Sequence, residues 1–367
     1  MHYFVVLTTE CNLRCLYCYG ENYSCLFSNY KFPYDYEPTP SEITYSISDL
    51  KKFIEKDNDP TIIFYGGEPT LRTDLIKQIM DQINAKFMLQ TNGTLLKNLG
   101  EKYVKRLENV MFSIDGDEQT NDYFRGKGTY KKIIENVNWL RKINYKGEVL
   151  ARMTVMEPNN FYDSAKYLMN IFDSIHWQLN ALFYRDYEIR KEKFEPWKEK
   201  YREDVRRLFD DWMNDVRKGK VYRIYPFIGL VDSFLKNERV RLRCGAGWAQ
   251  YVIQTDGKIA PCVAMMGMKD FYAGDIFNSE PSNLLKFDVG GSCNNCKLRG
   301  SCGGRCLYAN LTMFWGVEGF KKICSLTEDL IMYVQDHIEE IRNLINKGII
   351  SIDDFNYPKF NSCEIIP

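Results

Sequence analysis

The sequence predicts an α/β protein in which a partial, TIM-like (β/α)6 barrel is followed by a small cysteine-rich domain. Residues 1 to about 183 alternate short apolar runs with amphipathic stretches of helical period, which is typical of β–α units around a parallel sheet. We count six such units, fewer than the eight of a closed barrel, so we expect an open one. A second group of cysteines follows residue 240 and sets the second domain apart.

The elements of the barrel follow from local composition. Each predicted strand is a short run rich in β-branched or aromatic residues, namely Tyr3–Thr8, Thr61–Tyr65, Phe87–Gln90, Val110–Ile114, Val149–Val155 and Trp177–Phe183. The predicted helices include Pro40–Lys56 with Ser41 as its N-cap, Leu71–Asn84, Tyr130–Ile143 and Asn160–Phe172. Because active sites of such barrels lie at the carboxyl ends of the strands, functional residues should follow the strands directly.

Composition restricts the class of partner. The 367 residues include 49 basic and 49 acidic side chains, so a nucleic acid or an anionic membrane is not expected as a partner. No apolar stretch approaches the ~18 residues of a membrane span, and Met1 leads into the first strand without a signal peptide. We therefore expect a cytoplasmic protein.

The cysteines indicate metal sites. A reducing compartment makes a disulfide framework from the 12 cysteines improbable, and only three histidines are available for mixed sites. Zinc and iron–sulfur centres both remain open at this point. Cys11, Cys15 and Cys18 follow the first strand, and three thiolates would hold three irons of a [4Fe–4S] cluster and leave the fourth iron open to another ligand.

A second motif follows the second strand. Gly66 and Gly67 would let a ligand approach the backbone closely, and Glu68 beside them could offset a cationic group. Alone, these residues with Pro69 could equally be a strand-to-helix turn. Their place one β–α unit after the three-cysteine loop favours a binding role.

With its CxxxCxYC loop and its Gly-Gly-Glu-Pro motif, the chain resembles the radical S-adenosylmethionine (SAM) enzymes. The resemblance implies that SAM chelates the open iron and is cleaved to a 5′-deoxyadenosyl radical, with Gly66, Gly67, Glu68 and Pro69 holding the methionyl amino group. It also implies that Tyr17 packs near the adenine and that Ser113 and Arg125 contact the ribose or carboxylate. Ser113 could instead merely end a strand, and Arg125 could pair with Asp115 or Asp122. The same choice applies to Thr91, Asn92, Arg152 and Thr154.

The middle of the chain is predicted to be a helical connector between the barrel and the second group of cysteines. Residues 184–220 alternate acidic and basic side chains at helical spacing, which predicts a solvated amphipathic helix, and a second helical segment spans Tyr225–Asn237. Seven further cysteines come next, four of them among glycines that allow tight turns around a metal: Cys244, Cys262, Cys293, Cys296, Cys302, Cys306 and Cys324. The close pairs alone would also suit a zinc ribbon.

The full seven-cysteine pattern resembles the SPASM domain of radical SAM enzymes that modify peptides and proteins, which carries two auxiliary [4Fe–4S] clusters. The resemblance assigns Cys244, Cys262 and Cys306 to the first auxiliary cluster and Cys293, Cys296, Cys302 and Cys324 to the second. The first cluster then lacks a fourth protein ligand, and substrate, water or a side chain could fill that position. Cys25 and Cys363 are the two cysteines without an assignment, and each is either such a ligand or a bystander thiol. Sulfatase-maturing members place an Asp after the residue matching Cys262, but Val263 stands here, so we do not expect formylglycine formation.

These resemblances predict a radical SAM domain at 1–183, a helical connector at 184–240, a SPASM domain at 241–330 and a C-terminal helix and tail at 331–367. The expected function is an enzyme that abstracts hydrogen from a peptide residue, while the auxiliary clusters accept an electron or bind substrate. The alternatives are protein oxidation of the sulfatase-maturase kind, or a non-catalytic zinc or electron-transfer protein.

Three [4Fe–4S] clusters and SAM are the expected cofactors, with a flavodoxin- or ferredoxin-like electron donor as a partner. Because the first strand begins at Tyr3, we expect no N-terminal leader-binding domain. A separate leader-binding protein could present the peptide, or the barrel could bind it directly. The aromatic loop Tyr19–Tyr36 would then either contact substrate or pack over the barrel mouth.

Overall fold

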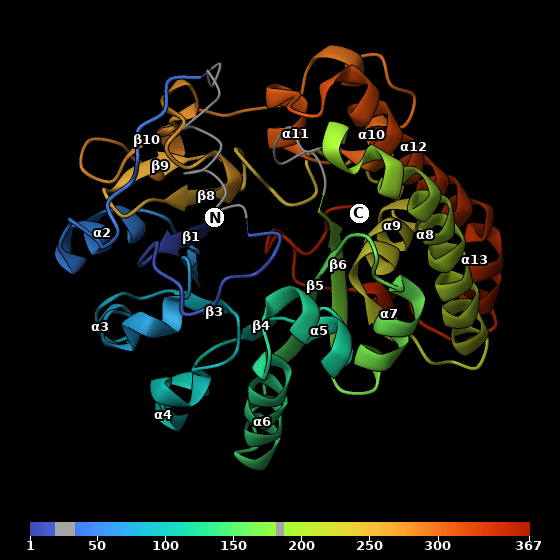
Figure 1. The fold of residues 1–367 in the computed structure, drawn as a ribbon, viewed down its shortest axis with the longest axis horizontal. Helices are drawn as coiled ribbons and strands as arrows, with labels where there is room; N and C mark the ends of the chain where they lie inside the picture. Colours follow the sequence, from blue (N-terminus) through green and yellow to red (C-terminus); the bar gives the residue numbers. More distant parts are fainter. Residues whose placement is uncertain (19–33, 181–186) are drawn as a thin grey trace. The chain divides into compact units, whose positions relative to one another are not determined.

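The computed structural model describes residues 1–18, 34–180 and 187–367 (Figure 1). These residues form two compact units, each assembled from separate stretches of chain. The first unit comprises residues 1–114, 121–150 and 246–288, and the second comprises residues 115–120, 151–245 and 289–367.

The first unit is built on a mixed sheet with the strand order β10-β9-β8-β1-β2-β3-β4. Its parallel strands are β1 (His2–Val6), β2 (Thr61–Tyr65), β3 (Lys86–Thr91), β4 (Asn109–Ser113) and β8 (Gln250–Ile253), and β9 (Lys258–Ala260) and β10 (Gly274–Asp275) continue it antiparallel. In β1 to β3 nearly every residue is buried, as expected for parallel strands covered on both faces. The stacked rings of Phe64 and Phe87, 5.8 Å apart, join β2 to β3 within this core.

Short helices connect these strands. They are α2 (Ile47–Ile54), η1 (Pro69–Arg72), α3 (Thr73–Gln82), η2 (Leu96–Leu99), α4 (Glu101–Val104), α5 (Glu118–Arg125, in this unit from Asn121), α6 (Thr129–Lys142), η3 (Val263–Met265), η4 (Lys269–Phe271) and η5 (Pro281–Asn283). Figure 1 shows α2 and α3 on the outer side of the parallel strands. Each buries one apolar stripe, for example Leu50, Phe53 and Ile54 of α2.

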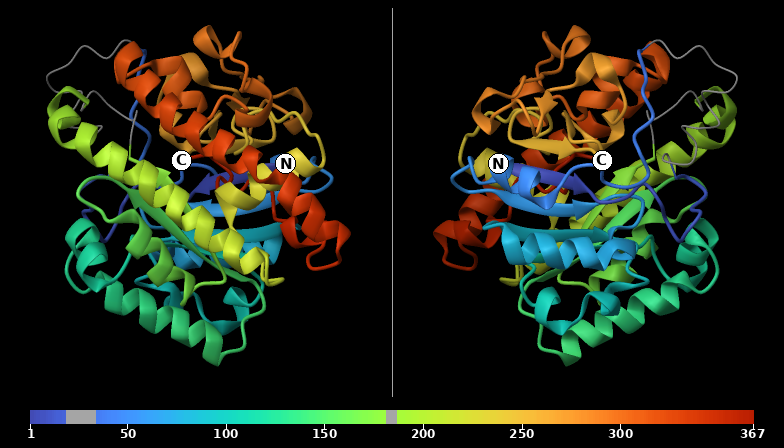
Figure 2. Two further views of the ribbon diagram at one scale, coloured as in Figure 1. Left: turned by 90° about the vertical axis from the view of Figure 1, so that its right-hand side faces the viewer. Right: turned by 90° about the vertical axis from the view of Figure 1, so that its left-hand side faces the viewer.

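The second unit contains β5 (Glu148–Val155, in this unit from Ala151), β6 (Ser174–Leu179) and β7 (Arg223–Ile224). Its helices are α7 (Phe161–Met169), α8 (Tyr187–Val216), α9 (Tyr225–Leu235), η6 (Gly291–Cys293), α10 (Arg299–Cys302), α11 (Leu307–Thr312), α12 (Gly316–Asp336), α13 (Ile338–Asn346) and η7 (Ile352–Phe355). The long helices α8 and α12 lie side by side (Figure 2). Buried Trp177 of β6 packs against Phe161 of α7, with ring centroids 4.6 Å apart.

The predicted α/β class and open barrel are confirmed, because neither part of the sheet closes on itself among the described strands. Strands β1 to β5 lie within two residues of their predicted bounds. The sixth strand begins three residues earlier than predicted: β6 runs from Ser174 to Leu179 and begins with buried polar residues that hydropathy does not mark. Residues 181–183 of the predicted strand lie outside the described residues. None of the described helices combines the length and apolar character that a membrane crossing requires.

Two further features correct the sequence-based elements. The helix expected from Pro40 begins at Ile47, because Ser46 and Asp49 form a capping box there. Ser41 is not its cap; the Ser41 carbonyl accepts hydrogen bonds from Thr8 and Thr9 at the end of β1, each at 2.9 Å. Strands β8 to β10 were not expected, and they add the segment around Cys262 to the sheet of the first unit.

Candidate active site and cysteine-lined cavity

The loop with Cys11, Cys15 and Cys18 starts where β1 ends and runs beside the chain that leaves β2. Backbone hydrogen bonds of 2.9 and 2.8 Å join Gly67 N–H to the Thr8 carbonyl and Glu68 N–H to the Glu10 carbonyl. A Cβ at Gly66 would lie 2.3 Å from the Thr8 oxygen, and one at Gly67 would lie 2.3 Å from the Glu10 oxygen. The two glycines therefore allow the two strand ends to approach each other.

Glu68 is fully buried behind this loop. One carboxylate oxygen accepts from the Thr70 N–H, the Thr70 hydroxyl and the Thr91 hydroxyl, and the other accepts from the Asn92 N–H at 2.7 Å. Burial raises the pKa of Glu68, and these hydrogen bonds act in the opposite direction. Glu68 thus joins the end of β2 to the end of β3 through its side chain.

Asn92 connects this network to the cysteine loop. Its amide nitrogen donates to the Asn12 side-chain oxygen at 2.8 Å and to the Cys11 sulfur at 3.8 Å. Its oxygen accepts from Thr94 N–H at 3.0 Å, while Asn12 donates to the Thr94 hydroxyl at 2.9 Å. The loop after β3 therefore fixes the first part of the cysteine loop, a role for Asn12 and Thr94 that the sequence did not indicate.

The three thiols of the loop have partial access to solvent. Cys11 is exposed, Cys15 and Cys18 are half-buried, and the Cys18 N–H donates to the Cys15 carbonyl at 3.0 Å. Partial burial raises the pKa of the Cys11 thiol, to which Glu68 and Cys18 contribute electrostatically. Cys11 and Cys18 therefore lie close enough to influence each other. Three accessible thiols on one short loop are a donor set that suits an iron–sulfur cluster.

The predicted SAM contacts fall into two groups. Tyr17 and Arg125 lie together in the first unit: the guanidinium is 5.4 Å from the Tyr17 ring centroid, and Leu16 N–H donates to the Phe124 carbonyl. Both side chains are buried, and Ser113 ends β4 with a half-buried side chain. Their roles toward SAM stay predictions. Pro69 begins η1 directly after Glu68.

Arg152 and Thr154 lie on β5 in the second unit. Thr154 N–H donates to an Asp115 carboxylate oxygen at 2.8 Å, and Arg152 donates to the Gln178 side chain at 3.4 Å. Asp122, the other acid considered for Arg125, accepts from the Gly128 and Tyr130 backbone N–H groups.

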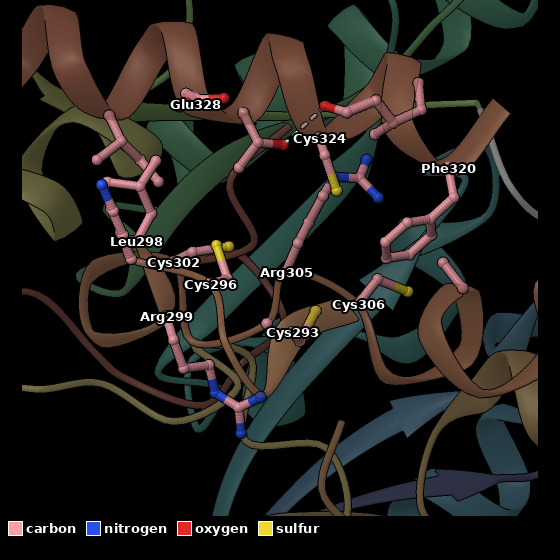
Figure 3. Close-up of a pocket in the computed structure, with 16 residues that line it drawn as sticks. Cys293, Cys296, Leu298, Arg299, Cys302, Arg305, Cys306, Phe320, Cys324 and Glu328 are labelled. Carbon is pink, nitrogen blue, oxygen red and sulfur yellow. Dashed lines mark hydrogen bonds between the residues drawn. The ribbon is translucent and has the colours of Figure 1, made fainter. Parts of the chain in front are cut away.

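A cavity of about 250 Å³ in the second unit gathers five of the seven downstream cysteines (Figure 3). Its wall comes from the segment around η6, α10 and α11 and from α12, and its thiols belong to Cys293, Cys296, Cys302, Cys306 and Cys324. Burial raises the pKa of Cys324 to about 11, and Cys302, Cys293 and Cys296 act on it electrostatically. The four residues assigned to the second auxiliary cluster thus surround one space.

In the described part of the chain, no three cysteine, histidine or acidic side chains stand close enough to share one metal ion. Asn310 also donates to the Cys293 sulfur at 3.4 Å, a contact that the sequence did not reveal.

The first auxiliary set is divided between the units. Cys244 and Cys306 belong to the second unit, where Cys244 is buried and Cys306 lines the cavity. Cys262 follows β9 in the first unit. This ligand set therefore stays a prediction. Cys363 is fully buried in the C-terminal tail, and Cys25 lies outside the described residues.

Only the end of the predicted aromatic loop is described. The Tyr34 ring lies 5.2 Å from that of Phe271, and Tyr36 forms an isolated bridge with Met268. These contacts attach residues 34–36 to the segment that follows Cys262. Tyr23, Phe27, Tyr30 and Phe32 lie outside the described residues.

Comparison with known proteins finds relatives of this chain. The sequence pattern of the radical SAM superfamily matches residues 5–165. A cysteine-type anaerobic sulfatase-maturating enzyme of Clostridium novyi is 25% identical over 82% of this chain and 85% of its own. The radical SAM cyclopropyl synthase TigE of Paramaledivibacter caminithermalis is 24% identical over 94% of this chain and 75% of its own.

The fold is also found among solved structures. The structure of native anSMEcpe with bound AdoMet and Cp18Cys peptide is similar with a TM-score of 0.70, covering 95% of this chain and 99% of that one. At 19% identity this similarity establishes a shared fold.

Proposed function

Because the chain is an enzyme of the radical SAM superfamily, we propose that it uses a 5′-deoxyadenosyl radical to modify a peptide or protein. The observation that carries the proposal is the pairing of two cysteine sites in one chain. Cys11, Cys15 and Cys18 form an accessible loop after β1, and five further cysteines line a cavity. A single radical-forming site would not require the second set.

The residues around the first site would bind and orient SAM. A [4Fe–4S] cluster on the three thiolates would supply the electron that cleaves SAM. Glu68 and Asn92 hold the loop against the ends of β2 and β3, so the thiols that would hold the cluster are fixed in place. Tyr17 offers a buried aromatic face and Arg125 a buried cation, which suit an adenine ring and a carboxylate respectively.

Two auxiliary [4Fe–4S] clusters complete the proposal. Cys293, Cys296, Cys302 and Cys324 would hold one of them in the cavity, and Cys244, Cys262 and Cys306 would hold the other with a ligand still to be identified. They would accept an electron from the substrate or bind it. A flavodoxin- or ferredoxin-like donor would reduce the first cluster, and a separate leader-binding protein is a further proposed partner.

The peptide substrate is inferred from the relatives. These relatives include a sulfatase-maturating enzyme and a cyclopropyl synthase, and one similar structure holds a Cp18Cys peptide. We do not extend formylglycine formation to this chain, because Val263 stands where the sulfatase-maturing pattern has an acid. Thioether bonds, carbon–carbon crosslinks and side-chain oxidation are the remaining reaction types.

Anaerobic reconstitution tests the assignment of the sites. The wild-type protein should bind about twelve irons and release 5′-deoxyadenosine from SAM when dithionite is added. Replacing Cys11, Cys15 and Cys18 together by alanine should abolish that release and leave about eight irons. Leu16→Ala alters an exposed side chain of the same loop without removing a thiol and should leave both readouts unchanged. Cleavage of SAM by the triple variant at the wild-type rate would refute the proposed active cluster.

Co-expression tests the substrate class. The chain should change the mass of a peptide encoded by a small neighbouring open reading frame, and the triple cysteine variant should not. A zinc-loaded, colourless protein after anaerobic purification would instead support the non-catalytic alternative.

A further inference from the structure

Arg305 is a buried cation in the wall of the cysteine-lined cavity. Its side chain is 7% exposed, and Nε and Nη2 have no hydrogen-bond partner among the described residues. Figure 3 shows its guanidinium beside the sulfur of Cys324, in a cavity that Cys293 and Cys306 also line. Cys302 of α10 and Cys324 of α12 line the same cavity, so thiols from two different helices share this space with Arg305.

No acidic side chain compensates this charge within the described part of the chain. Glu328, the carboxylate that lines the same cavity, is exposed and forms no ion pair with Arg305. Burying these nitrogens is strongly unfavourable, since their three N–H donors lose their hydration without gaining acceptors among the described residues. The cavity therefore needs an anion for Arg305 to be stable where it lies.

The local backbone holds Arg305 in this position. Gly303, Gly304 and Arg305 have φ values of 73°, 95° and 49°, so three consecutive residues adopt the left-handed region. A Cβ at Gly303 would lie 2.8 Å from the Leu242 nitrogen, and one at Gly304 would lie 2.4 Å from a Val289 methyl. Arginine rarely adopts such a φ value. The close packing around the two glycines fixes this backbone turn, which directs the Arg305 side chain into the cavity.

We propose that Arg305 donates hydrogen bonds to the sulfur atoms of the cluster in this cavity and that its buried charge raises the reduction potential of that cluster. The proposal rests on the proposed function, because it requires a [4Fe–4S] cluster on Cys293, Cys296, Cys302 and Cys324. A cluster with its thiolates is the anion that the cavity needs. Reduction adds one electron and one negative charge, so a nearby cation stabilises the reduced state.

Arg305 and Asn310 would act from different sides. Asn310 donates to the Cys293 sulfur at 3.4 Å and is fixed by its oxygen, which accepts the Gly290 N–H at 2.7 Å. It supplies a neutral hydrogen bond, whereas Arg305 supplies both donors and a charge. Arg305 is thus a positioning and tuning residue, and its defining effect should appear in a potential.

Arg305→Gln and Lys297→Gln form a matched pair, since each removes one positive charge from the cavity wall. Arg305 is buried and Lys297 is exposed, so only the first charge is poorly screened. Anaerobic redox titration with dithionite, followed by electron paramagnetic resonance, measures the potential of the signal that Cys324→Ala removes. We expect Arg305→Gln to make reduction at least tenfold less favourable, a shift of about 59 mV for one electron. Lys297→Gln should shift it by less than a third of that amount.

Arg305→Lys is a second variant that tests the proposal if Arg305→Gln does not retain the iron of the cavity cluster. Lysine retains the positive charge but not the planar set of donors of a guanidinium. The reduction potential of the cluster in Arg305→Lys should therefore lie closer to that of the wild type than to that of Arg305→Gln. Equal potentials in wild type, Arg305→Gln and Lys297→Gln, with full iron content, would overturn the role of Arg305. If only Arg305→Lys retains iron, a reduction potential lower than that of the wild type by about 59 mV or more would do the same.

Iron content separates failure of this inference from failure of the proposed function. If Cys324→Ala removes about four irons, the cavity holds a cluster and the potentials test Arg305 directly. If it removes none, the proposed cluster assignment is wrong, and the proposal for Arg305 falls with it.

Discussion

Glu68→Gln should destabilise the first unit and loosen the cysteine loop. Glutamine keeps one acceptor oxygen, so either the Asn92 N–H or the three donors on the other oxygen would face an amide N–H. A buried hydrogen bond to a charged group contributes about 1.5–3 kcal/mol, and we expect a loss of roughly 2 kcal/mol after part is offset by no longer burying a charge. For a unit of this size that corresponds to a decrease of roughly 4–8 °C in melting temperature.

The assay is thermal unfolding of iron-loaded protein under anaerobic conditions, followed by circular dichroism. Glu10→Gln is the matched control, because Glu10 lies on the same loop with an exposed side chain. Release of 5′-deoxyadenosine should also fall in Glu68→Gln, since Asn92 loses the anchor that holds it near Cys11.

The two possible roles of Glu68 give different results. If the carboxylate contacts SAM directly, Glu68→Gln should raise the SAM concentration needed for half-maximal release and leave the melting temperature near that of Glu10→Gln. That result would refute the structural role argued here. A lower melting temperature together with lower iron content in the first cluster would support it.

Three further outcomes are expected. Gly67→Ala should reduce the iron content of the first cluster, because the new methyl group would lie 2.3 Å from the Glu10 carbonyl oxygen. Gly290→Ala is the control, because its new methyl group would have no atom within 4 Å and should not change that iron content. Iron analysis of the two variants measures the difference. Burial raises the pKa of Glu364 to about 8, so proton binding to this carboxyl group stabilises the fold at low pH. This contribution to stability is lost as the pH rises through 8. The melting temperature of Glu364→Gln should therefore be near that of the wild type at pH 5 and above it at pH 9. Because Val263 replaces the acid of the sulfatase-maturing pattern, mass spectrometry should find no formylglycine in a sulfatase-derived cysteine peptide, and its formation would contradict this reasoning.

The parallel strands could be predicted because their signal is local. Strands β1 to β5 are runs of buried apolar residues bounded by polar turns, and hydropathy marks such runs wherever they pair. Strand β6 was shifted because Ser174 and His176 are polar yet fully buried. Strands β8 to β10 are four, three and two residues long, and β8 gains its stability from β1, about 250 positions earlier in the sequence. Local composition carries no trace of such a pairing.

Of the candidate site, the sequence predicts the residues whose signal is local but not the contacts between loops. Cysteine spacing identifies the thiols, and the position after a strand singles out Glu68 and Asn92. Contacts made by side chains far apart in sequence, such as Asn12 with Asn92, depend on how the loops fold back. The sequence also shows Arg305 next to Cys306 among glycines, but only the structure shows that its side chain is buried with its guanidinium beside Cys324.

Both cysteine sites contain an asparagine that donates to a sulfur while its own oxygen accepts a backbone N–H. Asn92 donates to Cys11 and accepts from Thr94, and Asn310 donates to Cys293 and accepts from Gly290. The charges behind these asparagines are opposite, because buried Glu68 stands behind the first site and buried Arg305 faces the second. A nearby anion disfavours the reduced state of a cluster and a nearby cation favours it. If each site holds the proposed cluster, we therefore expect the one on Cys11, Cys15 and Cys18 to have the lower reduction potential, which suits a donor of an electron to SAM. The one in the cavity should have the higher potential, which suits the proposed acceptor of an electron from substrate.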